Sequence, residues 1–218
     1  MSIPKVIHQV WGGPMPLGIQ ECLDSVKRVM PDYDVVIHKK EDMDELVPEQ
    51  FSLVERTNLY RNRLLYSQGG WWIDADCYAL RSLNSDKSYS FGMQERSANY
   101  SPSLVVDWAF GSEAGNPDLT GVLRRLAPSI SNRRSSSGQT TKMLPLGEHM
   151  SRELGGRRLE PSHVYGSRRF SHYKHRRSKR IQRDATLVHL FLGSWYAKDW
   201  RNGVIDKVKE VESWRYRI

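Results

Sequence analysis

Asp74 and Asp76 flank a single alanine directly after a short apolar run. In an extended backbone, residues i and i+2 point to the same side, so both carboxylates can face one ligand. Carboxylate oxygens suit hard divalent cations such as Mg²⁺ or Mn²⁺, which complete their coordination with water and substrate phosphates. The same spacing also fits a surface turn that carries two acidic residues. The context of the pair therefore decides between a metal-diphosphate site and an ordinary turn.

The segment before this pair predicts a helix that leads into a buried strand. Apolar residues recur at helical spacing from Leu53 to Ser67, and Gly69-Gly70 is placed to end that helix. Trp71 to Ile73 then has the composition of a short buried strand. The two aspartates are thus expected where this strand ends. Trp71 and Trp72 should point to opposite faces of the sheet, and neither is assigned to the substrate.

The remaining elements alternate between strands and helices in the first 110 residues. We expect strands at 4–11, 33–37, 88–93, 104–110 and 186–190, and helices at 17–30 and at 117–126, the last capped by Asn116. The first helix should bury a stripe made of Leu17, Cys22, Leu23, Val26 and Met30. The β-α-β order at the start predicts parallel neighbours joined by a right-handed crossover, within which His8 is expected to be a hydrogen-bonded structural histidine.

The composition suits a single compact α/β domain over residues 1–218. The 218 residues are 39% hydrophobic and 27% charged, and we find no internal repeat or convincing linker. No stretch has the roughly 20 consecutive apolar residues of a membrane span, and the first residues read as a strand rather than a signal peptide. Cys22 and Cys77 form no CxxC pair, which favours a reducing compartment and argues against a cysteine metal site. We therefore expect a cytoplasmic protein, either free or peripheral at the inner membrane surface.

The net charge of +8 is concentrated in the C-terminal half of the chain. Residues 124–183 hold 16 Lys and Arg against three acidic residues. A block of this kind is typical of a protein that meets a polyanionic partner, although a solvated basic loop without a partner has the same composition.

The run from Asn58 to Asp76 resembles the DXD-containing sugar-transferase family, which includes yeast initiating α-mannosyltransferases, bacterial capsular transferases and, more distantly, clostridial glucosylating toxins. In that family a helix with Asp-x-x-Arg leads through Leu-Tyr and Gly-Gly into an aromatic strand that ends in Asp-x-Asp. Ile3–Gly13 looks like the family's first strand, and His189–Trp195 looks like its closing His…Gly-Ser-Trp segment. The resemblance implies a GT-A type nucleotide-diphospho-sugar transferase domain with a Rossmann-like mixed sheet. Its nucleotide-binding half would span 1–110 and its acceptor-side half 111–218.

The resemblance also implies roles for residues on the donor side. Val10 and Trp11 would border the base, and Asn58 and Arg61 would lie beside the ribose and phosphates. The i, i+3 spacing puts the last two on one helical face, although Arg61 as a plain surface charge is the alternative. Asn58 stands where the family has Asp, so it can bond a ribose hydroxyl but cannot pair electrostatically with Arg61.

The same resemblance makes Asp76 the direct metal ligand and gives Asp74 contacts to the ribose and to metal-bound water. His189 matches a position that completes the metal shell, and a structural histidine is the alternative for it. Ser194 and Trp195 would reach the donor phosphates from a C-terminal loop that closes over the nucleotide and excludes water.

The implied reaction is glycosyl transfer with retention of configuration, from a nucleotide-diphosphate sugar to a glycan, a lipid-linked or another hydroxyl acceptor. A UDP-sugar is favoured as the donor, and a GDP-sugar is the alternative. Mn²⁺ or Mg²⁺ would neutralise the charge on the departing diphosphate, so no enzyme nucleophile is required. Asp107 is the candidate for a polar group near the sugar. Arg168–Arg183 is expected to recruit an anionic acceptor.

Two other functions fit part of the sequence. A nucleic-acid-binding protein would use Arg168–Arg183 to grip phosphates, with Phe170 and Tyr173 stacking on bases. This explains the charge but not the context of the Asp-x-Asp pair. A metal-dependent phosphohydrolase would use the same carboxylates, but the sequence has no evident second cluster for a two-metal site.

Overall fold

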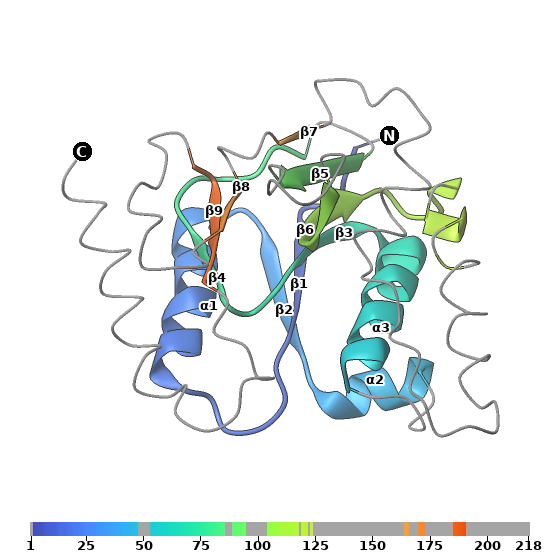
Figure 1. The fold of residues 1–218 in the computed structure, drawn as a ribbon, viewed down its shortest axis with the longest axis horizontal. Coiled ribbons are helices and arrows are strands. Elements are labelled where there is room, and N and C mark those ends of the chain that lie inside the picture. The colour runs from blue at the N-terminus through green and yellow to red at the C-terminus, as the bar shows by residue number, and fades with distance from the viewer. Residues whose placement is uncertain are drawn as a thin grey trace.

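The computed structural model describes residues 2–47, 53–85, 89–94, 104–117, 119–121, 123, 164–165, 170–172 and 185–190. These residues form a six-stranded sheet and a three-stranded sheet, with helices on both faces of the larger one (Figure 1). The larger sheet has the order β2-β1-β3-β6-β5-β7. Its strands are β1 (Val6–Val10), β2 (Asp34–His38), β3 (Gly70–Ile73), β5 (Tyr89–Gln94), β6 (Leu104–Ser112) and β7 (Val164–Tyr165).

The larger sheet is mixed, and its parallel part comes from the start of the chain. β1 pairs in parallel with both β2 and β3, which confirms the predicted β-α-β unit. β6 then pairs antiparallel with β3 and with β5. The carboxyl ends of β1 and β3 therefore lie side by side, and the chain leaves β3 at Asp74.

A second sheet, of order β4-β9-β8, continues from the same point. β4 (Cys77–Ala79) pairs antiparallel with β9 (Leu187–His189), and β8 (Phe170–His172) pairs in parallel with β9. The short turn between β3 and β4 is closed by a hydrogen bond from the Cys77 N–H to the Asp74 carbonyl, 3.0 Å long. The predicted Asp-x-Asp motif thus lies in the turn that joins the two sheets.

Helix α1 (Leu17–Val29) packs its apolar stripe against one face of the larger sheet and against the second sheet. Cys22, Leu23, Val26 and the following Met30 are fully buried, as the sequence predicts. Leu17 was predicted on this stripe and is 57% exposed, which makes that assignment wrong. Ile19 is buried instead. It lies three residues before Cys22 and four before Leu23, so it shares their helical face, whereas Leu17 does not.

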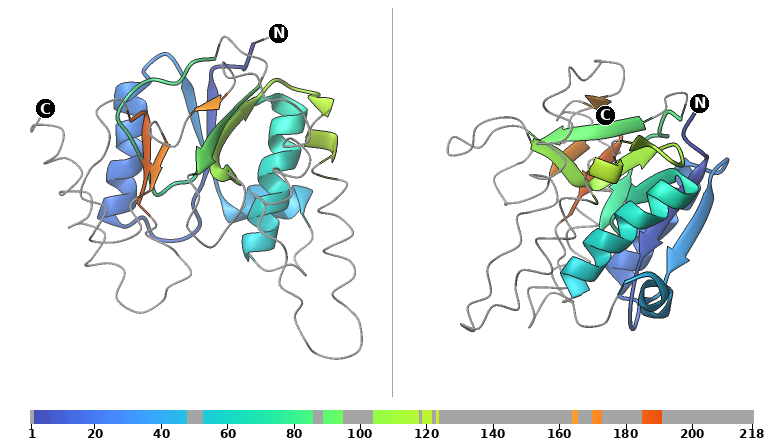
Figure 2. Two further views of the ribbon diagram at one scale, coloured as in Figure 1. Left: turned by 45° about the horizontal axis from the view of Figure 1, so that its top comes forward. Right: turned by 90° about the vertical axis from the view of Figure 1, so that its right-hand side faces the viewer.

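Helix α3 (Leu53–Gln68) lies on the opposite face of the sheet, as Figure 2 shows from two further sides. It ends at Gly69, whose N–H bonds the Leu65 carbonyl at 2.9 Å. Gly69 and Gly70 have φ of 70° and 99°, and a Cβ on Gly70 would lie 2.7 Å from the Val6 carbonyl oxygen. The predicted glycine stop is confirmed, and both steric space and backbone conformation require glycine there.

Four elements were absent from the sequence-based prediction, namely α2, β4 and the short strands β7 and β8. The short α2 (Lys40–Leu46) is mostly polar and buries Met43, and β4 follows Asp76 directly. The other predicted strands agree with β1, β2, β3, β5, β6 and β9 within about two residues at each end. Helical backbone begins at Pro117 after Asn116, as expected, while the end of that predicted helix lies outside the described residues.

Candidate active site

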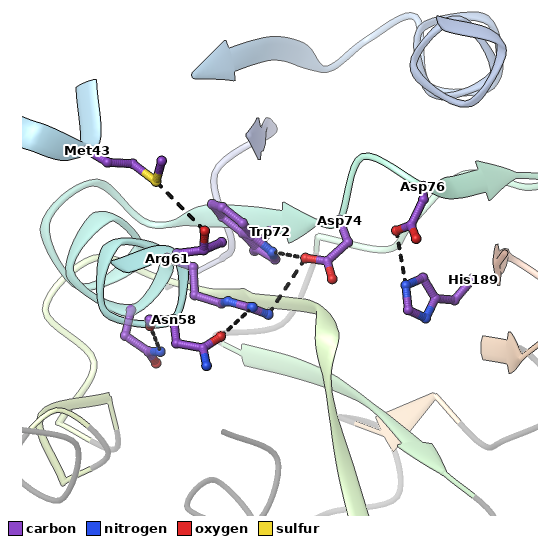
Figure 3. A network of polar contacts seen from close by, with 9 residues as sticks. Met43, Asn58, Arg61, Trp72, Asp74, Asp76 and His189 are labelled. Atoms are coloured by element: carbon purple, nitrogen blue, oxygen red, sulfur yellow. Dashed lines mark hydrogen bonds and ion pairs between the residues drawn. The ribbon is translucent and has the colours of Figure 1, made fainter. Parts of the chain in front are cut away.

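Asp74 is held where β3 ends by groups from its own strand and from α3 (Figure 3). The Trp72 indole N–H donates to Asp74 Oδ1 at 2.7 Å, and Arg61 Nη1 lies 3.7 Å from the same oxygen. The backbone N–H of Asp74 donates to the Trp108 carbonyl at 2.8 Å, which ties the turn to β6. One carboxylate oxygen is therefore fixed in direction, and 28% of the Asp74 side chain stays exposed to a ligand.

Arg61 is buried between the helix and the strand and is not a surface charge. Its Nη2 donates to Asn58 Oδ1 at 2.6 Å, and its guanidinium lies 5.3 Å from the centre of the Trp72 ring. The prediction that Asn58 and Arg61 share a helical face is confirmed. The neutral amide cannot form an ion pair, as predicted, but it accepts a hydrogen bond from the guanidinium. Arg63, two residues on, is exposed and points elsewhere.

The electrostatics of Asp74 favour a cationic ligand. Burial raises the pKa of Asp74 to about 6, Arg61 acts against this shift, and the charge of Asp76 adds to it. The negative charge of Asp76 disfavours the charged form of Asp74, and a nearby cation would favour it. The charge around Asp74 is therefore suited to a cation bound close by.

Asp76 lies on the other side of the turn, against the second sheet. Its Oδ1 lies 3.0 Å from His189 Nε2, and its carbonyl accepts the Leu190 N–H at 3.0 Å. The His189 ring stacks on the Trp108 indole with 5.0 Å between the ring centres and 16° between the planes. The antiparallel register places His189 directly opposite Cys77. Residues 113 positions apart in the chain thus meet as the sequence resemblance predicted.

The residues present fit a hard divalent cation. The nearest ligand atoms of Asp76, Cys77 and His189 all lie within 4.8 Å of one another. Burial, together with the charges of Asp76 and Asp74, raises the pKa of the Cys77 thiol well above its usual value. Since a thiolate is the ligand form of cysteine, carboxylate and imidazole are the better donors here. Both cysteines are free and buried.

Val10 and Trp11 lie beside this turn at the carboxyl end of β1. The Trp11 N–H donates to the His38 carbonyl at 3.0 Å, and its indole N–H donates to the Pro14 carbonyl at 3.2 Å. Both bonds hold the indole at the edge of the loop 11–16, and the residue is half-buried. The role beside a base that the resemblance implies for Val10 and Trp11 stays a prediction.

Solved glycosyltransferase structures share this arrangement of sheets and helices. A glycosyltransferase involved in the glycosylation of the major capsid of PBCV-1 matches with a TM-score of 0.52 and 11% identity, covering 94% of this chain and all of that one. The galactosyltransferase LgtC matches with a TM-score of 0.50 and 11% identity, covering 98% and 100%. The PaToxG glycosyltransferase matches with a TM-score of 0.50 and 16% identity over 71% of each chain. The chain has the GT-A glycosyltransferase fold.

A curated relative points in the same direction. Inositol phosphoceramide mannosyltransferase 3 of Schizosaccharomyces pombe is 29% identical over 141 residues. The match covers 57% of this chain and only 37% of the relative. No protein-family model matches the chain. The chain thus matches little more than a third of the length of that relative.

Some predicted site residues cannot be placed. Ser194 and Trp195 lie outside the described residues, as does most of Arg168–Arg183. Asp107 belongs to β6 by its backbone, and its side chain lies outside the description. Among the described residues, no helix is long and apolar enough to cross a membrane.

The structure adds two aromatic residues that the sequence analysis did not assign to the site. Trp72 contacts both Arg61 and Asp74, and Trp108 contacts His189. For Trp72 the sequence analysis predicted only that it faces the opposite way from Trp71. A signal was present for Trp72, because residues i and i+2 of a strand share a face and Asp74 is its i+2 neighbour.

Proposed function

We propose that this chain is a metal-dependent, retaining glycosyltransferase that takes its sugar from a nucleotide-diphosphate donor. A UDP-sugar is favoured, and a GDP-sugar is the alternative. The observation that carries the proposal is the turn at Asp74 and Asp76, where two carboxylates face Arg61 on one side and His189 on the other. Cationic, anionic and imidazole groups meet there at the carboxyl ends of parallel strands, where open α/β sheets bind nucleotides.

In this proposal Asp76 and His189 hold Mn²⁺ or Mg²⁺, and Asp74 contacts the ribose and metal-bound water. The bound cation neutralises charge on the departing diphosphate. Arg61 and Asn58 lie beside the ribose and phosphates. Arg61 is buried and already donates a hydrogen bond to Asn58, so little of its side-chain freedom is left to lose when a phosphate binds.

The rest of the donor site follows from the position of the loops. Val10 and Trp11 border the base, with the indole available for stacking. Ser194 and Trp195 close over the phosphates from the C-terminal segment and exclude water, which limits hydrolysis of the donor. The nucleotide-binding half then covers 1–110, and 111–218 supplies the acceptor side and the closing loop.

The acceptor is proposed to be anionic. The curated relative is named for a mannosyl transfer that involves inositol phosphoceramide, which is a phosphate-bearing lipid. The basic Arg168–Arg183 segment has the charge to recruit such a lipid or an anionic glycan at the inner membrane surface. Asp107 is the candidate polar group beside the transferred sugar.

A donor panel tests the reaction. UDP-glucose, UDP-galactose and GDP-mannose are each incubated with the protein and Mn²⁺, with and without EDTA, and the released sugar is followed by proton NMR. We expect hydrolysis of one donor, lost with EDTA, in which the first-formed anomer has the donor's configuration. Release of the opposite anomer would contradict retention. Metal-independent binding of single-stranded DNA, with no donor turned over, would favour the nucleic-acid alternative.

The anionic acceptor is tested separately by replacing Arg176, Arg177, Lys179 and Arg180 with Gln. Transfer to vesicles that contain phosphatidylinositol should weaken and should fall with added NaCl, because exposed charges are screened over about 8 Å at physiological ionic strength. Donor hydrolysis should be unchanged. Equal loss of both activities, or transfer by the parent that ignores salt, would refute acceptor recruitment by this segment.

A further inference from the structure

A chain of hydrogen bonds runs through three buried side chains on the α3 face of the sheet. His8 Nε2 lies 3.1 Å from the Gly69 carbonyl oxygen, and His8 Nδ1 lies 3.0 Å from His38 Nε2. His38 Nδ1 lies 2.8 Å from the Tyr60 hydroxyl. All three residues are less than 9% exposed. The chain links β1, the end of β2, α3 and the glycine turn before β3.

With both rings neutral, the chemistry of the end group fixes the direction of every bond in this hydrogen-bonded chain. A carbonyl oxygen only accepts, so His8 Nε2 carries the hydrogen, and His8 Nδ1 of the neutral ring accepts. His38 Nε2 must then donate to His8, and the remaining His38 Nδ1 of the neutral ring accepts from the Tyr60 hydroxyl. Both histidines thus carry their proton on Nε2, and Tyr60 is the first donor.

The surroundings keep these protonation states at neutral pH. Burial, and next the neighbouring His38, lower the pKa of His8 to about 4. Burial lowers the pKa of His38 as well, against a small opposing effect of Asp42, whose carboxylate lies 4.0 Å from His38 Nδ1. Burial, followed by Asp42 and Glu45, raises the pKa of Tyr60 to about 12. None of the three groups changes its charge near pH 7.

Each member of this set of hydrogen bonds is linked to a residue of the candidate active site. The His38 carbonyl accepts the Trp11 N–H, so the position of His38 sets where the loop after β1 begins. Tyr60 directly precedes Arg61 on α3. Gly69 starts the turn that delivers β3 to Asp74. The three elements that carry Trp11, Arg61 and Asp74 are thus joined by one directional set of bonds.

We propose that His8, His38 and Tyr60 are positioning residues of the donor site, which set the placement of Trp11 and Arg61 relative to Asp74. This inference rests on the proposed function. Apolar side chains of similar shape would fill the same space at little loss of stability, because a buried hydrogen bond adds only a small net gain. Directional bonds instead hold one arrangement, and binding groups need to be held within about 0.5 Å.

The first test is Tyr60→Phe, which removes only the hydroxyl. The dissociation constants of UDP and GDP are measured with Mn²⁺ at room temperature, with the folded state checked by circular dichroism. For the nucleotide that the parent binds, we expect an increase of about three- to tenfold, the range that one lost hydrogen bond gives. Tyr66→Phe is the matched control, since Tyr66 lies on the same helix and is 39% exposed. It should leave the constant unchanged.

The second test asks whether the hydrogen-bonded chain of His8, His38 and Tyr60 acts on nucleotide binding through Arg61. In an Arg61→Lys background, Tyr60→Phe should have a clearly smaller effect on the dissociation constant, because the group that it positions is already altered. Equal effects in both backgrounds would overturn the positioning role, as would a Tyr60→Phe protein that binds like Tyr66→Phe.

Nitrogen-15 NMR of the histidine rings tests the direction of these hydrogen bonds without any nucleotide. Both His8 and His38 should carry their proton on Nε2, and Tyr60→Phe should shift the His38 resonances. A proton on His38 Nδ1 would overturn the proposal. If the parent binds neither UDP nor GDP, the proposed function fails and the donor-site role falls with it. If the parent binds a nucleotide and Tyr60→Phe binds it equally well, only the positioning role of the three residues is overturned.

Discussion

The two faces of the larger sheet use burial in different ways. Toward α1, the sheet presents Ile7, Trp71 and Ile73, which pack with Val26 and Met30 in one apolar cluster. Toward α3, the same strands present His8 and Trp72. His8 is linked to Tyr60 through His38, and Trp72 lies against the guanidinium of Arg61. Apolar contacts have no preferred direction, whereas hydrogen bonds do. The α1 face is thus suited to stabilise the domain and the α3 face to orient the groups at its edge.

The comparison implies that stability and donor binding can be lost separately. A change on the α1 face should lower the free energy of unfolding and leave nucleotide affinity alone. A change among the site residues at the edge of the α3 face should weaken nucleotide binding and leave the free energy of unfolding nearly unchanged. The following predictions test this separation, from the largest expected effect to the smallest.

Asp76→Asn should separate the two properties furthest. Removal of a charged metal ligand is expected to lower sugar transfer more than about 100-fold. The free energy of unfolding should change by no more than about 1 kcal/mol, since the amide keeps the shape of the side chain. Asp74→Asn should give a less complete loss, and Asp32→Asn, an exposed acid distant in sequence, should behave as the parent. Normal Mn²⁺-dependent turnover of Asp76→Asn would remove Asp76 from the site.

Ile7→Ala should have the opposite profile. Ile7 is fully buried in the α1-facing cluster, so its truncation is expected to lower the free energy of unfolding by about 3 kcal/mol. The dissociation constant of the bound nucleotide should stay within about twofold of the parent value below the unfolding transition. Urea unfolding and calorimetric binding measure the two quantities. A large loss of affinity would mean that the faces are not independent.

Acid should destabilise the α3 face through its histidines. An unfolded histidine takes up its proton near pH 6.5, whereas burial lowers the pKa of His8 to about 4. The unfolded state therefore binds more protons between these values, and the free energy of unfolding should fall as pH drops from about 6.5 to about 4. The contribution of His8 is up to about 3 kcal/mol and levels off below pH 4. NMR titration of the His8 ring checks this, and a midpoint near 6.5 would contradict it.

The smallest effect is expected from two tryptophans that are adjacent in the chain. Trp72→Phe removes the indole donor to Asp74 and should weaken nucleotide binding about three- to tenfold, the range that one lost hydrogen bond gives. Trp71→Phe removes a similar bond to Ser85 on the other face and should affect only stability. Equal losses of affinity in both variants would erase the difference between the faces.

The fold was predictable where the chain organises itself locally. α1, α3 and the strands β1 to β3 follow from apolar spacing and the glycine pair, because each signal lies within or next to its own element. α2 was missed because a short polar helix with one buried residue has no apolar stripe to detect. β4 was missed because three residues are too few for an alternating pattern, and its partner β9 lies more than 100 residues away.

The residues of the candidate site also differ in this way: those close together in the sequence were easier to predict than those far apart. Asn58, Arg61 and Asp74 lie within one contiguous segment, and helical spacing placed the first two on one face. Their place beside the Asp-x-Asp pair came from the resemblance to a family. The contact of Asp76 with His189 came only from the resemblance to a family, since no local pattern specifies a pairing over that distance. His8 was predicted to be a hydrogen-bonded histidine. Its partners His38 and Tyr60 depend on how β2 and α3 pack, which the sequence does not state.

The most direct measurement is calorimetric binding of UDP and GDP to the parent and to Asp76→Asn, each with Mn²⁺ and with EDTA. If Asp74 and Asp76 hold a cation for a nucleotide diphosphate, one nucleotide should bind the parent at least about tenfold more tightly with Mn²⁺ than with EDTA. Asp76→Asn should lose most of that difference while it remains folded. Nucleotide binding that ignores both the metal and the substitution would contradict the central claim.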